Sequence, residues 1–481
     1  MNSKLLHIYQ QSNPEKFNHE FLKSKSNEDV LKFVKGIFKS LEVVNSINSD
    51  CKIELMEVRL ETNEGTFSPI IQQGKKYKSV LESRFNKIIY KMRFEAKDGI
   101  HEQEYELLLN KLIDDNFYIN EGVRFFPIFQ IIDSGTYSIK NGISLKLLLM
   151  PITLCKLKEI EIESMSLNKY VGNLFSFNLF NKKINPLLVF LARYGFEGML
   201  KFFSLEKHIS ITTKNDEDEN YEYFKINTVI LKVSKDVIDD SFSMDLIVNF
   251  IELLENKTTI QNIDNQEFWY KKLGQEYTKN QLSQVEKGRN TLVSVERLMD
   301  DTSKELLRIK DSHKENTFTI MRYLMKNFYE LFKLDKTSLE HKRVRLIEYY
   351  LNPLRTYLSK QMFRLINTPN ITLNSLKKIF NNISPMFLIK GIINNKQLRR
   401  YYNSTNEINL FGATLKYTLR GPQAIAGAMT PKQRDVQESY VGRISLIASS
   451  ASDPGVSGTI SPFLEHWDYY FTESSTLPDS E

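Results

Sequence analysis

The sequence predicts a multidomain α+β protein. At 481 residues the chain exceeds what one hydrophobic core usually organises, so about two to four domains are expected. Some stretches space their apolar residues as helices do and others alternate as strands do, which indicates a mixed fold. The composition, 41% hydrophobic and 26% charged, is typical of a folded protein and not of a disordered one.

The first part of the chain contains both patterns. Apolar residues recur at helical spacing over 29–44 and predict a helix. Strand-like runs follow at 53–60 and at 90–94, where large apolar residues alternate with cations, as in a half-buried strand. A short helix is expected over 104–113, and the acidic-amide cluster at 114–116 predicts a turn.

The middle of the chain predicts further local structure. The residues after the turn predict a hairpin that closes on a second apolar strand, ending near Ile131. The acidic run 215–220 is interpreted as a solvated hairpin tip. The stretch 282–309 is long and helical, and 318–332 carries an apolar stripe at helical spacing. Such a stripe belongs to the core far more often than to a partner groove.

Charge and cysteine content narrow the function classes. The net charge of +6 is compatible with nucleic acid, and the two cysteines, Cys51 and Cys155, provide neither a disulfide framework nor a four-cysteine zinc site. The polar N-terminus shows no secretory signal. The longest apolar run, 143–155, is interrupted by Lys146 and is too short to span a bilayer. We therefore expect a cytoplasmic protein with no membrane partner.

No catalytic or metal site is expected in this chain. The seven histidines are scattered, and none is spaced from a Cys or Asp as a metal ligand would be. No glycine-rich phosphate loop ending in Gly-Lys-Ser/Thr occurs. Two-metal nucleotidyl transfer needs clustered carboxylates, and Asp216 and Asp218, in the acidic run, are poor candidates.

The most informative stretch is basic and rich in Gly and Pro. Between Met386 and Arg443, nine Lys and Arg residues stand against three acids, with Tyr401 and Tyr402 among them. Cations grip a phosphate backbone without reading its sequence, aromatics stack on bases or stiffen a loop, and glycines allow close approach. The alternatives are a solvated basic face and a mobile surface loop. The candidate nucleic-acid-binding residues are Lys390, Arg399, Arg400, Lys416, Arg420, Lys432, Arg434 and Arg443.

The order of residues at the end of this stretch is more specific. Arg434-Asp435-Val436, then five residues, then Gly442-Arg443 resembles a signature of the beta subunit of multisubunit DNA-dependent RNA polymerases. In that family the signature follows the fork loop and lies along the active-centre cleft. We interpret Asp435 as an internal partner that orients Arg434 or Arg443, not as a catalytic acid.

Two earlier segments resemble the same family in the same order. The family's first domain, the protrusion, carries a phenylalanine-x-isoleucine-asparagine-glycine turn, then arginine and glutamine. The matching residues here are Phe117, Ile119, Asn120, Arg124 and Gln130, with the glycine late, at Gly122. The run His341-Lys342-Arg343-Val344-Arg345, with a helix to Phe363, is similar to the point where the family's chain re-enters the protrusion. The alternative for this run is a basic helix start on a surface.

A fourth segment, 397–422, aligns without a gap with the rifamycin-pocket region of bacterial polymerases. The residues expected to shape this fork region are Gln397, Asn406, Gly421, Pro422, Asp435 and Gly442. Positions that hold rifamycin in the family are occupied by Asn403, Ala413 and Thr418, and Arg400 replaces a smaller amide. The resemblance therefore implies a rifamycin-resistant enzyme.

The resemblance implies a beta-like architecture, with a lobe inserted in the protrusion and a fork segment after it. The expected parts are 1–150, protrusion; 151–335, lobe-like insertion; 336–404, protrusion again; and 405–481, fork segment and acidic tail. The element that follows the signature in the family is replaced here by 448–453, which indicates a divergent polymerase. Split beta chains are a feature of giant tailed bacteriophages, so we expect the N-terminal piece of such a subunit.

The resemblance also implies the partners. The chain would be a non-catalytic subunit for DNA-directed RNA synthesis in the cytoplasm of an infected bacterium, with Mg²⁺ held by aspartates of a beta-prime piece. Its expected partners are the C-terminal beta piece, the beta-prime pieces, a promoter-specificity subunit, template DNA and nascent RNA. Two other functions remain open, a polymerase-associated DNA-binding specificity factor and a virion structural protein.

Overall fold

The computed structural model describes most of the chain. The described residues are 27–47, 51–61, 84–113, 117–120, 122–148, 150–213, 218–226, 229–254, 260–299, 303–304, 307, 316–333, 337–368, 370–389, 396–402, 406–421, 431–448, 455–461 and 471. The predicted turn at 114–116 lies outside them, as does most of the acidic tail. No helix in these ranges combines the length and the apolar character needed to cross a membrane.

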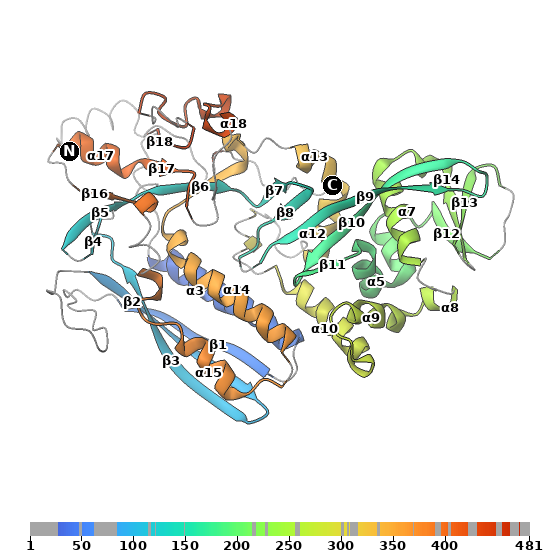
Figure 1. Ribbon diagram of the computed structural model, residues 1–481, viewed down its shortest axis with the longest axis horizontal. Coiled ribbons are helices and arrows are strands. Elements are labelled where there is room, and N and C mark those ends of the chain that lie inside the picture. Colours follow the sequence, from blue (N-terminus) through green and yellow to red (C-terminus); the bar gives the residue numbers. More distant parts are fainter. Residues whose placement is uncertain are drawn as a thin grey trace.

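An antiparallel sheet with helices packed on it forms one end of the molecule (Figure 1). The strands β1 (Cys51–Glu61), β2 (Phe85–Ala96) and β3 (Gly99–Asn110) pair in that order. Helices α3 (Asn27–Leu41) and α15 (Leu373–Asn381) and the short α4 (Val44–Ile47) pack on this sheet, and α14 (Asn352–Asn367) packs on α3 and α4. The ring of Phe38 stacks on Tyr90 at 4.5 Å, and Phe380 meets Phe94 at 4.8 Å, so distant segments share one core.

The helix predicted over 104–113 is wrong, because these residues continue strand β3. Tyr105, Leu107 and Leu109 are buried on one face, which is the period of a strand. Glu102, Glu104 and Glu106 alternate on the other face and pair with cations of β1 and β2, as in the 2.7 Å pair of Lys87 with Glu106. The Glu and Leu residues of this stretch have high helical propensity, and cross-strand pairing overrides it.

Two small sheets occupy the centre. The first has the order β16-β5-β4 and the second the order β15-β6-β17-β18, where β17 runs parallel to β6. Their strands are β4 (Tyr118–Asn120), β5 (Val123–Pro127), β6 (Phe129–Asp133), β15 (Lys342–Arg345), β16 (Arg399–Tyr401), β17 (Lys416–Thr418) and β18 (Ser457–Thr459). The predicted hairpin is confirmed as β4 and β5, and its second strand continues into β6.

A long hairpin leads from this centre to the other end of the molecule (Figure 1). It belongs to a five-stranded sheet of β7 (Thr136–Ile139), β8 (Gly142–Leu145), β9 (Ile152–Glu163), β10 (Lys169–Leu179) and β11 (Lys182–Ile184). The sheet therefore continues across residue 150. Beyond it, the strands β12 (Ile209–Thr212), β13 (Tyr221–Ile226) and β14 (Val229–Ser234) form a sheet of order β12-β14-β13.

Helices complete this second end. They are α5 (Pro186–Phe202), α6 (Lys235–Ile238), α7 (Ser241–Leu254), α8 (Ile260–Ile263), α9 (Gln266–Gln275), α10 (Gln284–Glu296), α12 (Thr317–Lys326) and α13 (Phe328–Lys333). The stripe over 318–332 is confirmed as core, since most of its apolar residues are buried. The helix expected over 282–309 is shorter, because α10 ends at Glu296.

The hairpin interpretation of 215–220 is wrong as well. The strands on its two sides, β12 and β13, do not pair with each other, because β14 lies between them. The acidic run is therefore part of a connection that crosses from one edge of the sheet to the other. Residues 214–217 themselves lie outside the described ranges. The carboxylate of Asp218 is partly exposed and lies 3.7 Å from Lys232 Nζ, so this pair resembles a surface salt bridge.

The basic run 341–345 forms a buried strand and not the start of a surface helix. β15 pairs with β6, and Arg343 and Arg345 are only 6% and 2% exposed in their side chains. Arg343 donates two hydrogen bonds of 2.6 Å to the Glu348 carboxylate, in the 3-10 turn η3 (Ile347–Leu351). Burial of these charges is tolerated because acceptors surround them.

Glu348 is the carboxylate on which this buried group depends. Burial opposes ionisation of Glu348, but Arg343 and Arg345 outweigh burial and lower its pKa to about 2. A carboxyl group with a depressed pKa stabilises the fold above its unfolded-state pKa of 4.5, and this contribution disappears as pH falls through about 2.

We predict that Glu348→Gln lowers the free energy of unfolding by about 3–5 kcal/mol, because it leaves buried guanidinium groups without their carboxylate. The matched control is Glu296→Gln, which breaks an exposed 3.0 Å pair with Arg193 and costs at most about 1 kcal/mol. Denaturant unfolding at neutral pH measures both variants. Equal losses would contradict the buried-pair interpretation.

Candidate nucleic-acid interface

An open hollow of about 420 Å³ lies where β16, β17 and β18 meet. Its walls come from three separate stretches of sequence, around residues 128, 397–420 and 448–458. It contains three of the predicted cations and a polar amide among small and apolar neighbours. The lining residues are Ile128, Gln397, Arg400, Lys416, Tyr417, Thr418, Arg420, Ala448, Val456, Ser457 and Gly458.

The three cations of the hollow differ in how they are held. Arg400 is exposed at the middle of β16, whose partner is β5. Lys416 is half-buried and donates from Nζ to Thr459 Oγ1 at 2.7 Å. Burial lowers the pKa of Lys416, and the nearby Arg400 acts in the same direction. Two cations that repel each other at an open hollow favour an anion between them.

Arg420 is positioned by its main chain. Its N–H donates to Thr418 Oγ1 at 3.0 Å, and its carbonyl accepts from Gln130 Nε2 at 2.9 Å. Gly421 follows with φ +114°, and a Cβ there would lie 2.8 Å from the same Gln130 nitrogen. Only glycine fits this position, for backbone conformation and for space alike.

Aromatic residues stiffen the strand behind the hollow. The Arg399 guanidinium lies 4.5 Å from the centre of the Phe125 ring, so Arg399 packs on the protein. Tyr402 stacks on Phe126 at 4.8 Å, while Tyr401 is 59% exposed. Tyr401 also packs on Phe125, at 5.1 Å between ring centres, so both tyrosines stiffen this strand, and Tyr401 is the more exposed of the two and the one that a base can reach.

The signature segment lies beside this strand system. The short helix α18 (Pro431–Arg434) ends at its first residue, and the 3-10 turn η5 (Glu438–Tyr440) lies within it. The buried Tyr440 donates its hydroxyl to Gly455 O at 3.2 Å, and Gly455 N donates to Arg434 O at 2.8 Å. The turn after η5 needs the positive φ of Gly442, +76°.

The charged residues of the signature make local contacts. Arg443 donates from Nη1 to Ser439 O at 2.9 Å. Arg434 and Asp435 are exposed, and within the described residues no ion pair joins Asp435 to either arginine. Arg434 therefore lies at the surface of this segment.

The remaining predicted residues are placed as follows. Gln397 lines the hollow from the 3-10 turn η4 (Lys396–Leu398). Asn406 is exposed and precedes α17 (Glu407–Thr414), where its Oδ1 accepts from Asn409 N at 3.4 Å. Lys432 belongs to α18, but its side chain is not described. Lys390 and Pro422 lie outside the described residues.

The four sequence segments that share the polymerase resemblance come together here. Strand β5 pairs with β16, and β6 pairs with both β15 and β17. The signature joins them through Ser439, whose Oγ accepts from Leu339 N at 3.0 Å beside β15. Segments up to three hundred residues apart therefore form one structural unit (Figure 1).

Sequence reasoning missed part of this hollow. Ser457 and Gly458 line it because β18 pairs with β17. A Cβ at Gly458 would lie 3.0 Å from the Tyr417 ring, so a larger residue there would crowd this close pairing. A short Gly-Val-Ser-Gly stretch carries no spacing signal that links it to residues 416–418.

The arrangement can hold and guide an anionic polymer, while nothing described in it supports metal catalysis. The described ranges contain no group of three His, Cys, Asp or Glu side chains positioned around a common point. The hollow presents cations, an amide, hydroxyl groups and backbone. Such a surface binds phosphates without sequence preference.

Comparison with known proteins identifies the family to which the chain belongs. Among curated proteins no match was found. A family model described as "Non-virion RNA polymerase subunit" matches residues 4–474, which is nearly the whole chain and includes every segment of the hollow. The chain therefore belongs to the non-virion RNA polymerase subunit family.

Proposed function

We propose that this RNA polymerase subunit is beta-like, and that it is the N-terminal piece of a split beta chain. The observation that carries the proposal is the convergence of the four resembling segments on one pair of sheets. Unrelated matches along a chain have no reason to pair with one another. Here the strand pairing of β5, β6, β15, β16 and β17 joins three of them directly.

The proposed role is to line the nucleic-acid path. Arg400, Lys416 and Arg420 would hold phosphates from fixed strands, and Tyr401 would offer a stacking face. The glycine-dependent turn at Gly421 brings the backbone close to the same hollow. A polymerase must move along any sequence, so contacts to the phosphate backbone suit it better than contacts to base edges.

Catalysis would belong to other chains. The reaction needs Mg²⁺ ions held by clustered carboxylates, and the described residues provide no such cluster. The proposed assembly therefore includes a C-terminal beta piece and beta-prime pieces with the metal-binding aspartates. It would also include a promoter-specificity subunit. The non-virion family indicates work in the infected bacterial cell, which is the proposed location.

The first prediction about function tests whether the hollow contacts nucleic acid. In the assembled polymerase, Arg400→Ala should reduce elongation about ten- to a hundredfold, the equivalent of one charged hydrogen bond of about 1.5–3 kcal/mol. It should also lessen the salt dependence of DNA binding by about one ion, because one phosphate contact is removed.

The matched control for that test is Arg193→Ala. Arg193 is a half-exposed arginine of α5, paired with Glu296. A polymerase that carries Arg193→Ala should transcribe at the same rate as the unchanged enzyme. If both variants behave alike, the hollow does not contact nucleic acid. If initiation fails while elongation is normal in Arg400→Ala, the chain acts as a DNA-binding specificity factor.

The second prediction concerns autonomy. The full-length chain alone, given template, nucleotides and Mg²⁺, should make no RNA, since its described residues hold no carboxylate cluster for two metal ions. The co-expressed polymerase serves as the positive control in the same primed-template assay. RNA synthesis by the single chain would place an active centre within it.

The third prediction concerns rifamycins. Ala413 offers no polar group, and the Thr418 hydroxyl already accepts from Arg420 N. Asn403 lies outside the described residues. A pocket that depends on hydrogen bonds loses affinity steeply when they are absent. Transcription should continue at rifamycin concentrations that stop the host polymerase, measured by titrating both enzymes side by side. Equal inhibition would mean that the alignment over 397–422 is wrong.

A further inference from the structure

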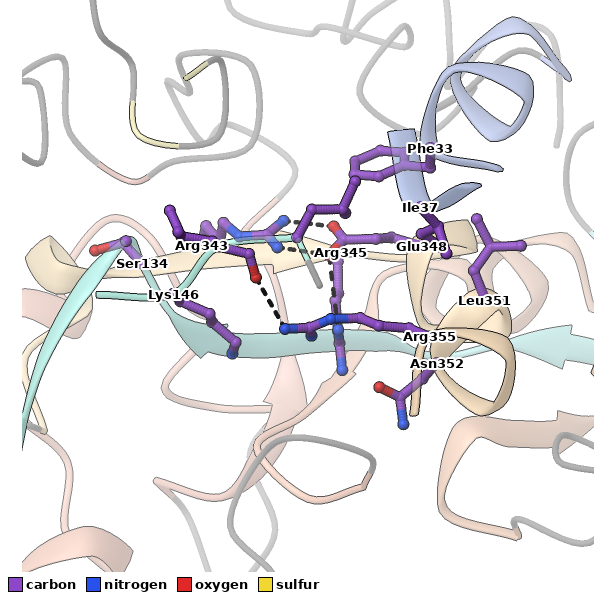
Figure 2. A pocket seen from close by; sticks show the side chains of 13 residues that line it. Phe33, Ile37, Ser134, Lys146, Arg343, Arg345, Glu348, Leu351, Asn352 and Arg355 are labelled. Atoms are coloured by element: carbon purple, nitrogen blue, oxygen red, sulfur yellow. Dashed lines mark hydrogen bonds and ion pairs between the residues drawn. The ribbon is translucent and has the colours of Figure 1, made fainter. Parts of the chain in front are cut away.

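A second, smaller cavity lies away from the hollow, between β15, α14, α3 and the end of β8 (Figure 2). Its volume is about 30 Å³, on a scale where one water needs about 10–15 Å³. Figure 2 shows four cationic side chains around it, opposite Phe33 and Ile37 of α3. The charged residues that line it are Lys146, Arg343, Arg345, Arg355 and Glu348.

Glu348 is already engaged by two of these cations. Arg343 holds both of its oxygens at 2.6 Å, and Arg345 Nη1 lies 3.7 Å from one of them. Arg345 also donates from Nε to Gln130 Oε1 at 2.7 Å. Among the described lining residues, this single carboxylate faces four cations.

The other two cations of the cavity, Lys146 and Arg355, are not among the described ion-pair partners of Glu348. Arg355 donates from Nη2 to Leu147 O at 2.9 Å, while its buried Nε has no partner among the described residues. No acceptor among those residues lies within hydrogen-bond distance of Lys146 Nζ. Asn352 adds a side-chain amide to the same wall.

This excess of positive charge around a single carboxylate, on side chains that are half-buried or buried, is costly without a counter-ion. Burial and the neighbouring arginines lower the pKa of Lys146 to about 7, and burial lowers the pKa of Arg355 to about 10. Asp133 opposes the shift of Lys146 but is paired with Lys342 at 2.8 Å. The cavity is therefore an environment in which an added anion would be strongly favoured.

We propose that this cavity binds a small tetrahedral oxyanion of the phosphate class, held by Lys146, Arg345 and Arg355. Guanidinium groups match oxyanions with directed pairs of N–H donors, and an ammonium adds a point charge. The volume suits an ion of a few atoms. The source would be orthophosphate, pyrophosphate or the phosphates of a nucleoside triphosphate.

The bound anion would join segments that are far apart in sequence. Lys146 follows β8, Arg345 lies on β15 and Arg355 on α14. One ion between them would link the five-stranded sheet to the central sheets and to helix α14. The inference is independent of the proposed beta-like role, because it concerns binding and stability and not transcription.

The test measures thermal unfolding of the full-length chain, alone or in the co-expressed polymerase, in phosphate against chloride at equal ionic strength. Phosphate should raise the melting temperature in a saturable way. Parallel titrations with pyrophosphate and a nucleoside triphosphate show which source binds tightest. Absence of any saturable shift with all three would overturn the proposal.

Variants of the lining residues test whether the anion binds in this cavity. Lys146→Met and Arg355→Met should each weaken the anion affinity about ten- to a hundredfold, the loss of one charged hydrogen bond. Arg355→Lys keeps the charge and should retain part of the affinity, which guards against variants that fail to fold. Arg193→Met is the surface control and should bind as the unchanged chain does. A phosphate shift that survives both Met variants would overturn the assignment.

A sulfate titration adds a pH test, because the charge of sulfate is constant over this range. Anion binding favours protonated Lys146, whose pKa in the free protein is about 7. Sulfate affinity should therefore be steady below about pH 7 and fall as pH rises above it. In Lys146→Met this fall should disappear. The same pH dependence in both proteins would contradict the role of Lys146.

Discussion

The central sheets depend on one buried amide. Gln130 is fully buried on β6, between β15 and β17, and both ends of its side chain are satisfied. Its oxygen accepts from Arg345, and its nitrogen donates to the carbonyl of Arg420. A buried amide with one end unpaired would cost the fold a large desolvation penalty. The position of Arg420, and of the turn at Gly421, follows from this requirement.

The molecule uses its cations in two different ways. Arg343 and Arg345 are buried and hold the central sheet to η3 through Glu348. Arg400 and Arg434 are exposed, one at the hollow and one on the signature segment. The net charge of the chain does not show which arginines are used in which of these two ways. What separates them is burial, because Arg343 and Arg345 are enclosed together with Glu348 whereas Arg400 and Arg434 lie at the surface.

The hollow is built so that its charged side chains need little reordering. Lys416 is tied to Thr459, and the strand of Arg400 is stiffened by Tyr402 on Phe126. Side chains that are already ordered lose less entropy when a ligand binds. The same rigidity would suit the proposed role of guiding a moving nucleic acid, because the contacts would have to form again at each step.

The sequence alone predicted the elements in which one pattern dominates. The amphipathic helix at 29–44, the strand at 90–94 and the buried stripe at 318–332 were recoverable, because each follows one period over its length. It also drew attention to the basic, Gly- and Pro-rich stretch that contains Arg400, Lys416 and Arg420, three of the eight candidate cations, which line the hollow. It failed at 104–113, where residues of high helical propensity, mainly Glu and Leu, also fit the alternation of a half-buried strand.

Only the tertiary structure decided which residues meet. It paired β18 with β17 and so brought Ser457 to the hollow, and it buried Arg343 and Arg345 while leaving Arg400 exposed. Local sequence records the propensity of a segment but not the partner that satisfies its hydrogen bonds and charges. Some of those partners lie far away in the chain, as Gln130 does from Arg345 at a separation of 215 residues, and long-range strand pairing is the physical reason that they could not be predicted from local sequence.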